Sequence, residues 1–511
     1  MPAFASPGPT ALAAGRRPWL ARPENQFLLL LPLVVFPLYY ELGRNPIQIW
    51  DESRMAVNAA EMARDGHWLV PHFGGRPDHW NTKPPLVIWL EALSFRMFGF
   101  SAWALRLPTL LASLTTVWLL FRFAARVLRR PLAGFLGAAV LATCGGFFHI
   151  HVARTGDYDA VLVCWQVLLW TQFFQYLETG EPRHFWWAAG ALLAATLTKG
   201  PAGLLGLPGL VVYTAGRGRL GALLRQPRLY LAASGWLVVV GGYFVAREAV
   251  DPGYWQAVQQ NDLGGRFLTT SGGHGGAWPY YLEELKNRHF DHWLWALAPA
   301  GLLAWLEPAG RPRRAAGLLL AFVGSWLLFI SLAQTKLGWY DAPMYPALAL
   351  LVGLGLARLW HDAARLYLPR LGRAGGWALR LGAFITLFYG SYRAAVQQLI
   401  EERHSDFGLG ADGHAARYLA ALPAARPQLT RLTLLARDAQ SPVLQYYQLQ
   451  VAHTPGHHLA VVPGRLASQL PAGQVVVVCD PSYRAALDSA FRVVLLHEDL
   501  PCQMLRLLPR Q

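Results

Sequence analysis

The stretch AAGLLLAFVGSWLLFISLAQT, residues 315–335, contains no Asp, Glu, Lys or Arg. Two further runs, 131–148 and 229–246, are equally free of charged side chains. A helix needs about 20 apolar residues to cross a bilayer, and inside a bilayer the backbone must satisfy its own hydrogen bonds. Because these runs are continuous rather than alternating, they predict transmembrane helices and not the strands of a barrel.

The composition of the whole chain supports this prediction. Of its 511 residues, 54% are hydrophobic and only 15% are charged, and the mean hydropathy is +0.26. A soluble domain usually carries about 25% charged residues. The chain therefore reads as a polytopic α-helical membrane protein.

Eleven segments have the length and apolar character of spans. A short, aromatic-rich segment at 84–99 carries Glu91 and Arg96, and we expect it to lie in the membrane interface without crossing. The predicted spans are 26–43, 107–125, 131–149, 159–177, 184–199, 200–216, 229–248, 292–307, 315–334, 342–360 and 375–396. Because the segments 26–43 and 184–216 are compressed, the predicted number of spans is about 11–13.

The distribution of charge sets the orientation. With the N-terminus inside, the inner loops and the tail 1–25 collect about eighteen arginines against about five acids, whereas the outer loop 41–106 is balanced. The net charge of +15 is therefore a feature of topology and of contact with anionic membrane lipids, and we expect no nucleic-acid partner. In a bacterial inner membrane, the N-terminus would be cytoplasmic and the C-terminus periplasmic.

The composition changes near residue 399. Short apolar runs at 431–437, 458–462, 474–480 and 491–496 predict strands, with helices between them, so 399–511 should form a small extracytoplasmic α/β domain after a membrane domain at 26–398. Cys479 and Cys502 lie in this domain and would pair if it faces an oxidising space. Cys144 and Cys164 lie in apolar runs and read as small buried side chains.

Unusual polar residues gather at the predicted outer ends of the spans and in the outer loops 41–106 and 250–291. Ionisable groups at membrane depth are costly, and this makes them functional candidates. Each one alone has a plainer interpretation, as a snorkelling side chain or a helix-end charge. The residues that gather there are Asp51, Glu52, Lys83, Arg154, Asp157, Asp159, Lys199, Arg266, His274, Lys336, Tyr340 and Tyr345.

Such a set of acids and cations suits one kind of chemistry. Lysine and arginine at the lipid–water boundary can bind a phosphate carried on a lipid. A neighbouring carboxylate can act as general base toward a hydroxyl that attacks a sugar carbon. The cations then stabilise the charge that develops on the leaving lipid phosphate. Trp side chains could stack on sugars, although Trp is also the ordinary interfacial anchor.

The segment DESRMAVNAAEMARDGHWLVPHFGGRPDHWNTKPPLVIWLEALSFRMFG, residues 51–99, resembles the first outer loop of the aminoarabinose transferase and protein mannosyltransferase superfamily, integral membrane glycosyltransferases of the GT-C fold. The motifs ARTGDYDA (153–160), LTKGPAG (197–203) and KLGWYDAPMYPALALL (336–351) are similar to later blocks of that family, in the same order. The resemblance covers roughly 45–360. It implies a polyprenyl-phosphate-linked sugar donor and inverting transfer on the outer face to a lipid or glycan acceptor such as lipid A.

The resemblance also implies roles for individual residues. Asp51 matches the acid proposed as base, with Glu52 beside it, and Asp159 matches a second catalytic carboxylate. The donor phosphate would meet Lys83, Lys199 and Arg266. The remaining residues of the substrate cavity would be Arg54, Asp157, Lys336, Tyr340 and Tyr345.

One position departs from the family. The aminoarabinose transferases commonly have Glu before Lys-Pro-Pro, and that Glu helps to hold a metal, but the residue here is Thr82. The resemblance implies no organic cofactor, leaves His274 as a candidate metal partner, and puts a divalent metal in doubt. The histidines of the sequence HIH (149–151) have poor spacing for a metal on a helix.

Three other functions share parts of this pattern. A transporter or flippase of lipid-linked sugars needs similar cations but predicts inverted repeats and polar residues near the midplane, and the sequence shows neither. A protein O-mannosyltransferase would share the donor chemistry and differ in acceptor. A sensor with a ligand-binding outer domain is less supported, because the spans themselves carry the motifs.

Overall fold

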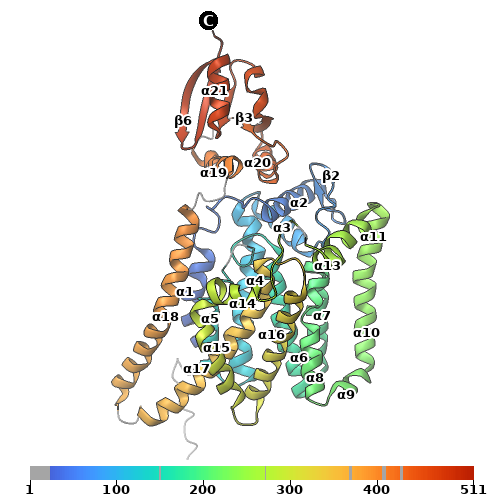
Figure 1. The fold of residues 1–511 in the computed structure, drawn as a ribbon, viewed down its shortest axis with the longest axis vertical. Helices are drawn as coiled ribbons and strands as arrows, with labels where there is room; N and C mark the ends of the chain where they lie inside the picture. Colours follow the sequence, from blue (N-terminus) through green and yellow to red (C-terminus); the bar gives the residue numbers. More distant parts are fainter. Residues whose placement is uncertain are drawn as a thin grey trace, which may run out of the picture.

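The computed structural model describes residues 23–510 apart from 149–150, 271, 368–370, 405–409 and 426–429. A bundle of roughly parallel helices forms the larger part, and a small sheet domain lies above one end of it (Figure 1). The helices α2 and α3 lie between the two parts (Figure 1). This arrangement places the predicted first outer loop against the C-terminal domain.

Each of the eleven ranges predicted as spans overlaps a helical segment, although in the range 131–149 the helix ends at Leu141. Five helical segments are long and apolar enough to cross a membrane, and a sixth is formed if the bent pair Pro182–Leu204 and Leu207–Gly216 counts as one. The chain is thus a multi-pass membrane protein. The five are Ala102–Val127, Tyr158–Thr179, Pro227–Val250, Arg311–Leu332 and Gly338–Leu366.

The helices of the bundle follow one another with short connections. Those of the first half are α1 (Pro23–Tyr39), α2 (Asp51–Asp65), α3 (Leu86–Phe98), α4 (Ala102–Arg122), α5 (Pro131–Leu141), α6 (Tyr158–Thr179), α7 (Pro182–Lys199) and α8 (Leu207–Gly216). Those of the second half are α9 (Leu220–Leu224), α10 (Pro227–Trp236), α11 (Gly242–Val250), α12 (Tyr254–Val258), α13 (Gly265–Leu268), α14 (Tyr280–Glu284), α15 (Asp291–Trp305), α16 (Arg311–Leu332), α17 (Tyr345–Tyr367) and α18 (Arg373–His404).

Short 3-10 and π-helical segments interrupt the helices of the bundle. The first three are η2 (Phe123–Val127), η3 (Gly200–Leu204) and η4 (Leu237–Gly241). They are followed by η5 (Gln259–Leu263), η6 (Leu285–His289) and η7 (Gly338–Met344). Such irregular turns often mark functional sites, because they re-aim side chains and backbone groups. A small hairpin, β1 (His72–Phe73) with β2 (Arg76–Pro77), closes the loop after α2.

The helix α3 has 13 residues and lies at the end of the bundle beside α2 (Figure 1). This placement agrees with the predicted interfacial helix at 84–99. It packs on α2 and α4, and its Ser94 hydroxyl donates to the carbonyl of Ala104. The Pro84–Pro85 pair ends the extended loop and sets the start of α3, since proline is tolerated where a helix begins.

The C-terminal domain is a five-stranded sheet with the order β4-β3-β5-β7-β6. The strand β3 is parallel to its neighbours β4 and β5, whereas β7 is antiparallel to β5 and β6. The four predicted strands are present, and sequence reasoning missed β7 and α19. The elements are α19 (Gly410–Ala425), β3 (Arg431–Ala436), α20 (Pro442–His453), β4 (His458–Pro463), η9 (Gly464–Gln469), β5 (Val475–Val478), α21 (Pro481–Ala490), β6 (Arg492–Asp499) and β7 (Cys502–Leu508).

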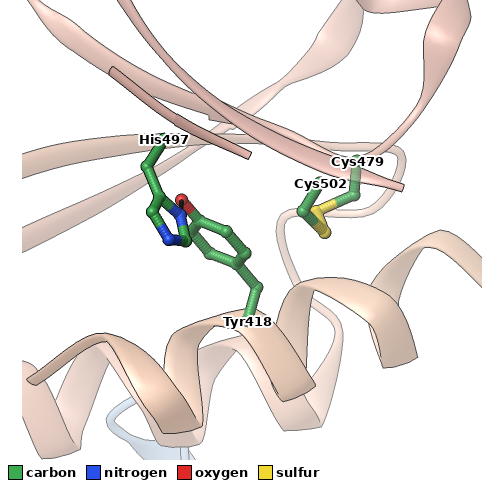
Figure 2. The surroundings of a disulfide bond; sticks show 4 residues. All are labelled: Tyr418, Cys479, His497 and Cys502. Carbon is green, nitrogen blue, oxygen red and sulfur yellow. Dashed lines mark hydrogen bonds between the residues drawn. A yellow bond between two sulfur atoms is a disulfide. The ribbon is translucent and has the colours of Figure 1, made fainter. Parts of the chain in front are cut away.

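A disulfide joins Cys479, after β5, to Cys502, at the start of β7. Figure 2 shows this bond near the Tyr418–His497 pair, in which the tyrosine hydroxyl lies 2.9 Å from Nδ1 of the histidine. The pairing that the sequence left open is therefore formed, while Cys144 and Cys164 are buried free thiols. Disulfides persist in oxidising compartments, so the bond favours an extracytoplasmic position for the domain.

The C-terminal domain is attached to the membrane domain by packing as well as by the chain. One hydrophobic cluster includes buried residues of α2 and α3 together with those of α19, α20 and the sheet. Polar contacts reinforce it: the Gln450 amide donates to the Phe100 carbonyl at 2.9 Å, and the Ile47 N–H donates to the Tyr447 hydroxyl at 3.4 Å. The domain is thus held over the loop that carries Asp51.

Candidate functional site

A cavity of about 170 Å³ lies where the start of α6, the end of α7 and the end of α16 meet. It receives residues from five separate parts of the chain, which agrees with the predicted convergence of distant loops. Its charged and hydroxyl-bearing lining residues are Lys83, Asp159, Lys199, Asp262 and Tyr340.

The strongest interaction in this cavity is the ion pair between Lys199 and Asp159. Nζ of Lys199 lies 2.6 Å from both carboxylate oxygens, and the two side chains are 8% and 2% exposed. Lys199 ends α7 and Asp159 lies in the first turn of α6, so helix packing brings the charges together. The lysine also lies 5.3 Å from the ring centroid of Tyr340.

Lys83 reaches the same cavity from the loop before α3. Its Nζ lies 5.4 Å from the ring centroid of Tyr158. The Tyr158 hydroxyl donates to Oδ1 of Asn81 at 2.8 Å, and Asn81 in turn donates to Asn58 of α2. This network fixes the loop on α2 and α6, and so positions the lysine.

Asp51 begins α2 after the left-handed Trp50, whose φ is 84°. Burial, and then the negative charge of Asp157, raise the pKa of Asp51 above its ordinary value. His151, Lys83 and Lys199 act in the opposite direction and lower that pKa. The carboxyl group retains 34% exposure, so it remains open to an incoming group. A raised pKa makes the Asp51 carboxylate a stronger base than an ordinary aspartate.

Asp157 caps the N-terminus of α6 by accepting the N–H of Tyr158. Its other oxygen lies 2.7 Å from Nδ1 of His151. Burial acts to raise the pKa of Asp157, but the hydrogen bond and charge of His151 prevail and lower it. Asp157 is thus an ionised carboxylate next to Asp51.

Glu52, predicted as catalytic, has a structural position. Its Oε1 accepts from Nε of Arg106 at 2.6 Å and from the Gly156 N–H at 2.8 Å, and its Oε2 accepts from the Gln48 N–H at 2.7 Å. Glu52 and Arg106 are 1% and 2% exposed. These contacts correct the prediction: Glu52 joins α2 to α4 and to the turn before α6, and it faces away from the cavity.

Three residues predicted for the cavity also make other contacts. Arg54 pairs with Asp78 through two hydrogen bonds of 3.0 and 2.7 Å. Nζ of Lys336 donates to the carbonyls of Ile330, Ser331 and Ala333 at the end of α16. The Tyr345 hydroxyl lies 2.8 Å from Nδ1 of His289 inside the core. These three side chains stabilise the walls around the site and do not line the cavity.

The metal site of the family does not fit at Thr82. The Thr82 hydroxyl donates to Oδ2 of Asp262 at 2.5 Å, and a neutral hydroxyl is a poor substitute for a carboxylate ligand. The His274 side chain is exposed on the loop that precedes α14. Within the described part of the chain, the three-residue group close enough to hold a cation is Asp51, His151 and Asp157, which does not include His274. The side chain of Arg266 lies outside the described residues.

Sequence reasoning gave Asp262 no role, and it gave His151 only a poor chance as a metal ligand. Asp262 lies in the sequence NDLGGRF (261–267) of the outer loop, where an acid close to paired glycines was the available signal. His151 lies two residues from His149, which directed attention to metal spacing and away from the two aspartates that it contacts in space.

The comparisons show that the fold is similar to that of a class of solved structures, the GT-C membrane glycosyltransferases. Residues 82–243 match the family model described as dolichyl-phosphate-mannose-protein mannosyltransferase. The structure is similar to that of ArnT from Cupriavidus metallidurans bound to undecaprenyl phosphate, with a TM-score of 0.65, 18% identity, and coverage of 94% of this chain and 97% of that one. The chain therefore has the fold of this class.

Within the class, the aminoarabinose transferases are relatives in sequence. An undecaprenyl phosphate-alpha-4-amino-4-deoxy-L-arabinose arabinosyl transferase 2 of Pseudomonas fluorescens is 26% identical over 377 residues, which cover 72% of this chain and 60% of the relative. The corresponding transferase of Pseudomonas aeruginosa PAO1 is 29% identical over 342 residues, which cover 64% of this chain and 59% of the relative. The chain thus spans about three fifths of the length of these curated relatives.

Proposed function

We propose that this protein is an integral membrane glycosyltransferase that moves a sugar from a polyprenyl-phosphate carrier to an envelope acceptor such as lipid A. The observation that carries the proposal is the cavity in which Lys83 and the Lys199–Asp159 pair lie within electrostatic reach of Asp51. The likeness to transferases named for an undecaprenyl phosphate sugar donor supports the same chemistry.

The reaction needs one base and one anion site. Asp51 takes the proton from the acceptor hydroxyl, and the freed oxygen attacks the anomeric carbon of the donor sugar. The bond between that carbon and the phosphate oxygen breaks, and its electron pair leaves with the polyprenyl phosphate. Lys83 and Lys199 stabilise the phosphate as its charge develops. A single displacement from the opposite face inverts the configuration at the anomeric carbon.

These groups account for the transfer without an organic cofactor. Lys83 and Lys199 supply positive charge at the leaving phosphate, and Asp159 orients Lys199 through the ion pair. We propose that Arg266, in the NDLGGRF sequence of the outer loop, adds a third cation, as the family resemblance implies. Chelation of the purified enzyme tests whether a divalent metal contributes.

We further propose that the active site faces the periplasm of a bacterial inner membrane, with the N-terminus in the cytoplasm. Two observations support this orientation. Arginines concentrate in the predicted inner loops, and the Cys479–Cys502 disulfide lies in the domain beside the cavity. Both support a site on the side where oxidising conditions prevail.

The test is transfer in liposomes that contain the purified protein, undecaprenyl-phosphate-linked sugars and lipid A. Mass spectrometry should find lipid A heavier by one sugar residue, and Asp51→Asn should lower the rate by about 10²–10⁴-fold, the usual contribution of a general base, while the protein remains folded. Wild-type protein that moves the intact donor across the bilayer without bond cleavage would identify a transporter. Full activity of Asp51→Asn would reject the assignment of the base.

A second acceptor is favoured by the match of residues 82–243 to the mannosyltransferase family model. In that case the hydroxyl of a protein Ser or Thr replaces lipid A, and the donor chemistry is unchanged. Parallel reactions with a hydroxyl-containing peptide and with lipid A decide between the acceptors, because only the true acceptor gains the mass of one sugar.

A further inference from the structure

His151 occupies a position between two carboxylates of the candidate site. Its Nδ1 lies 2.7 Å from Oδ2 of Asp157 and 3.9 Å from Oδ2 of Asp51. The ring stacks on Trp339 of η7, with centroids 3.7 Å apart and an interplanar angle of 22°. Only 16% of the side chain is exposed. Three separate parts of the chain therefore determine where this imidazole lies.

The backbone at His151 supports the same orientation. Its φ is 74°, in the left-handed region that residues with a side chain rarely adopt. The His151 N–H donates to the Thr155 hydroxyl at 2.9 Å, which holds the turn in place. Conformations of this kind persist only where the surrounding structure enforces them, and they concentrate at functional sites. The turn thus holds His151 in an unfavourable backbone conformation, and this conformation directs the ring toward Asp51 and Asp157.

The charges around this imidazole are mostly negative. Asp51 of α2 and Asp157 and Asp159 at the start of α6 face it, while Trp339 supplies an uncharged wall. Burial lowers the pKa of His151, but the hydrogen bond and charge of Asp157 and the charges of the other two aspartates prevail and raise it. In turn, the positive charge of His151 opposes the burial of Asp51 and lowers the pKa of that carboxyl.

We propose that His151 is a positioning residue for sugar transfer: as an imidazolium bonded to Asp157, it keeps Asp51 ionised and oriented toward the acceptor hydroxyl. This proposal rests on the function proposed above. His151 does not touch the reacting atoms; it acts through Asp51. Asp157 holds the imidazolium in place, in the way that a buried carboxylate orients a catalytic histidine.

The same three side chains could instead hold a divalent cation, since their ligand atoms lie within 4.8 Å of one another. That arrangement requires a neutral imidazole, because a protonated ring nitrogen cannot bind a metal. The separation of 2.7 Å between Nδ1 and Asp157 is that of a charge-assisted hydrogen bond, in which Nδ1 carries a proton and so cannot bind a metal. The two arrangements predict opposite responses to chelation.

The decisive measurement is the pH dependence of kcat/KM for wild type and for His151→Gln. An opposite charge nearby lowers the pKa of an aspartate by about 1–3 units, so its loss should move the acidic limb of the profile upward by about that amount. Activity at pH 6 should fall at least tenfold and recover toward wild type as the pH rises, with the KM for the donor little changed. A uniform loss at every pH would overturn the proposal.

His497→Gln is the matched control, because His497 also pairs with a neighbour, Tyr418, but lies in the C-terminal domain. Its pH profile should equal that of wild type. Asp157→Asn should give a smaller upward shift than His151→Gln, because it removes the partner that retains the proton of His151 but also a negative charge that raises the pKa of Asp51. Loss of activity on chelation, with recovery on adding Mn²⁺, would overturn the proposal in favour of a bound cation.

A second readout separates this proposal from the proposed function. Because the pKa of His151 is raised on folding, its stabilising effect is complete below the unfolded pKa and is lost as the pH rises through the folded value. The Tm of wild type should exceed that of His151→Gln at pH 6, and the difference should shrink by pH 9. If this pH dependence of Tm appears but no sugar is transferred, the proposed function is wrong while the His151–Asp157 ion pair is confirmed. If the difference in Tm between wild type and His151→Gln is the same at pH 6 and pH 9, His151 is not an imidazolium.

Discussion

Nζ of Lys199 lies 2.6 Å from each oxygen of the Asp159 carboxylate in a nearly dry part of the cavity. A buried pair of this kind is costly to break, since the remaining charge has no partner. We expect Lys199→Ala to lower the free energy of unfolding by about 3–5 kcal/mol and to abolish transfer. Thermal unfolding in detergent and the liposome assay measure the two effects.

The double variant Lys199→Met with Asp159→Leu separates stability from function. Replacing both charges with apolar groups of similar size is often neutral for stability, so most of the lost Tm should return. Transfer should remain absent, because the cation for the donor phosphate is missing. Transfer at the wild-type rate in this variant would mean that the pair serves only to stabilise the fold.

Glu52 should behave differently from its neighbour Asp51. Glu52→Gln breaks the buried pair with Arg106 and weakens the acceptor for the Gly156 N–H, so we expect a loss of about 3–5 kcal/mol in the free energy of unfolding. The fraction that remains folded should keep activity within tenfold of wild type. Asp51→Asn provides the contrast, with a stable fold and little activity. If the Glu52→Gln protein is stable but inactive, Glu52 takes part in catalysis, as the sequence predicted.

Glu91 of α3 is fully buried, and neither carboxyl oxygen has a hydrogen-bond partner among the residues that the structure describes. Burial, followed by the charges of Asp157 and Glu52, raises its pKa well above the ordinary value. A raised carboxyl pKa means that stability declines as the pH rises above the unfolded pKa, because the folded state resists ionisation. Glu91→Gln should remove this decline and give a higher Tm than wild type at pH 8, with equal values near pH 4. An unchanged difference across this range would contradict the interpretation.

The Thr82–Asp262 hydrogen bond positions a carboxylate that lines the cavity. Hydrogen bonds to charged groups contribute about 1.5–3 kcal/mol, so Thr82→Val should raise the KM for the donor roughly tenfold while leaving kcat within a factor of a few. Thr82→Ser keeps the hydroxyl and is the matched control. If both variants raise KM equally, the effect comes from packing and not from the hydrogen bond.

The Cys479–Cys502 disulfide closes a loop with a sequence separation of 23. Its loss in Cys479→Ser with Cys502→Ser should reduce the stability of the C-terminal domain by about 3 kcal/mol, mainly through greater freedom of the unfolded chain. Alkylation with a thiol reagent before and after reduction checks the bond in cells: labelling at these positions should require a reductant. Labelling without reduction would place the domain in a reducing compartment.

Much of this architecture follows from local patterns. The uncharged run at 315–335 predicted a helix because nothing else satisfies a backbone in lipid, and α16 begins and ends close to it. The β-branched run at 474–480 predicted β5 for a similar local reason. The strand β7 was missed: the segment QMLRLL lacks β-branched residues, and its pairing with β5 and β6 supplies the strand.

The sequence by itself determined that the chain is a membrane protein with a cluster of acids and cations at one face, since length, hydropathy and loop charge act locally. Only the tertiary structure decided which of those polar groups meet. Glu52 and Asp51 are adjacent in the chain, yet helix geometry turns one toward Arg106 and the other toward His151. Lys199 and Asp159 are 40 residues apart, and the packing of α7 on α6 makes them a pair. Side-chain direction and helix packing are properties of the folded chain, and they set the site.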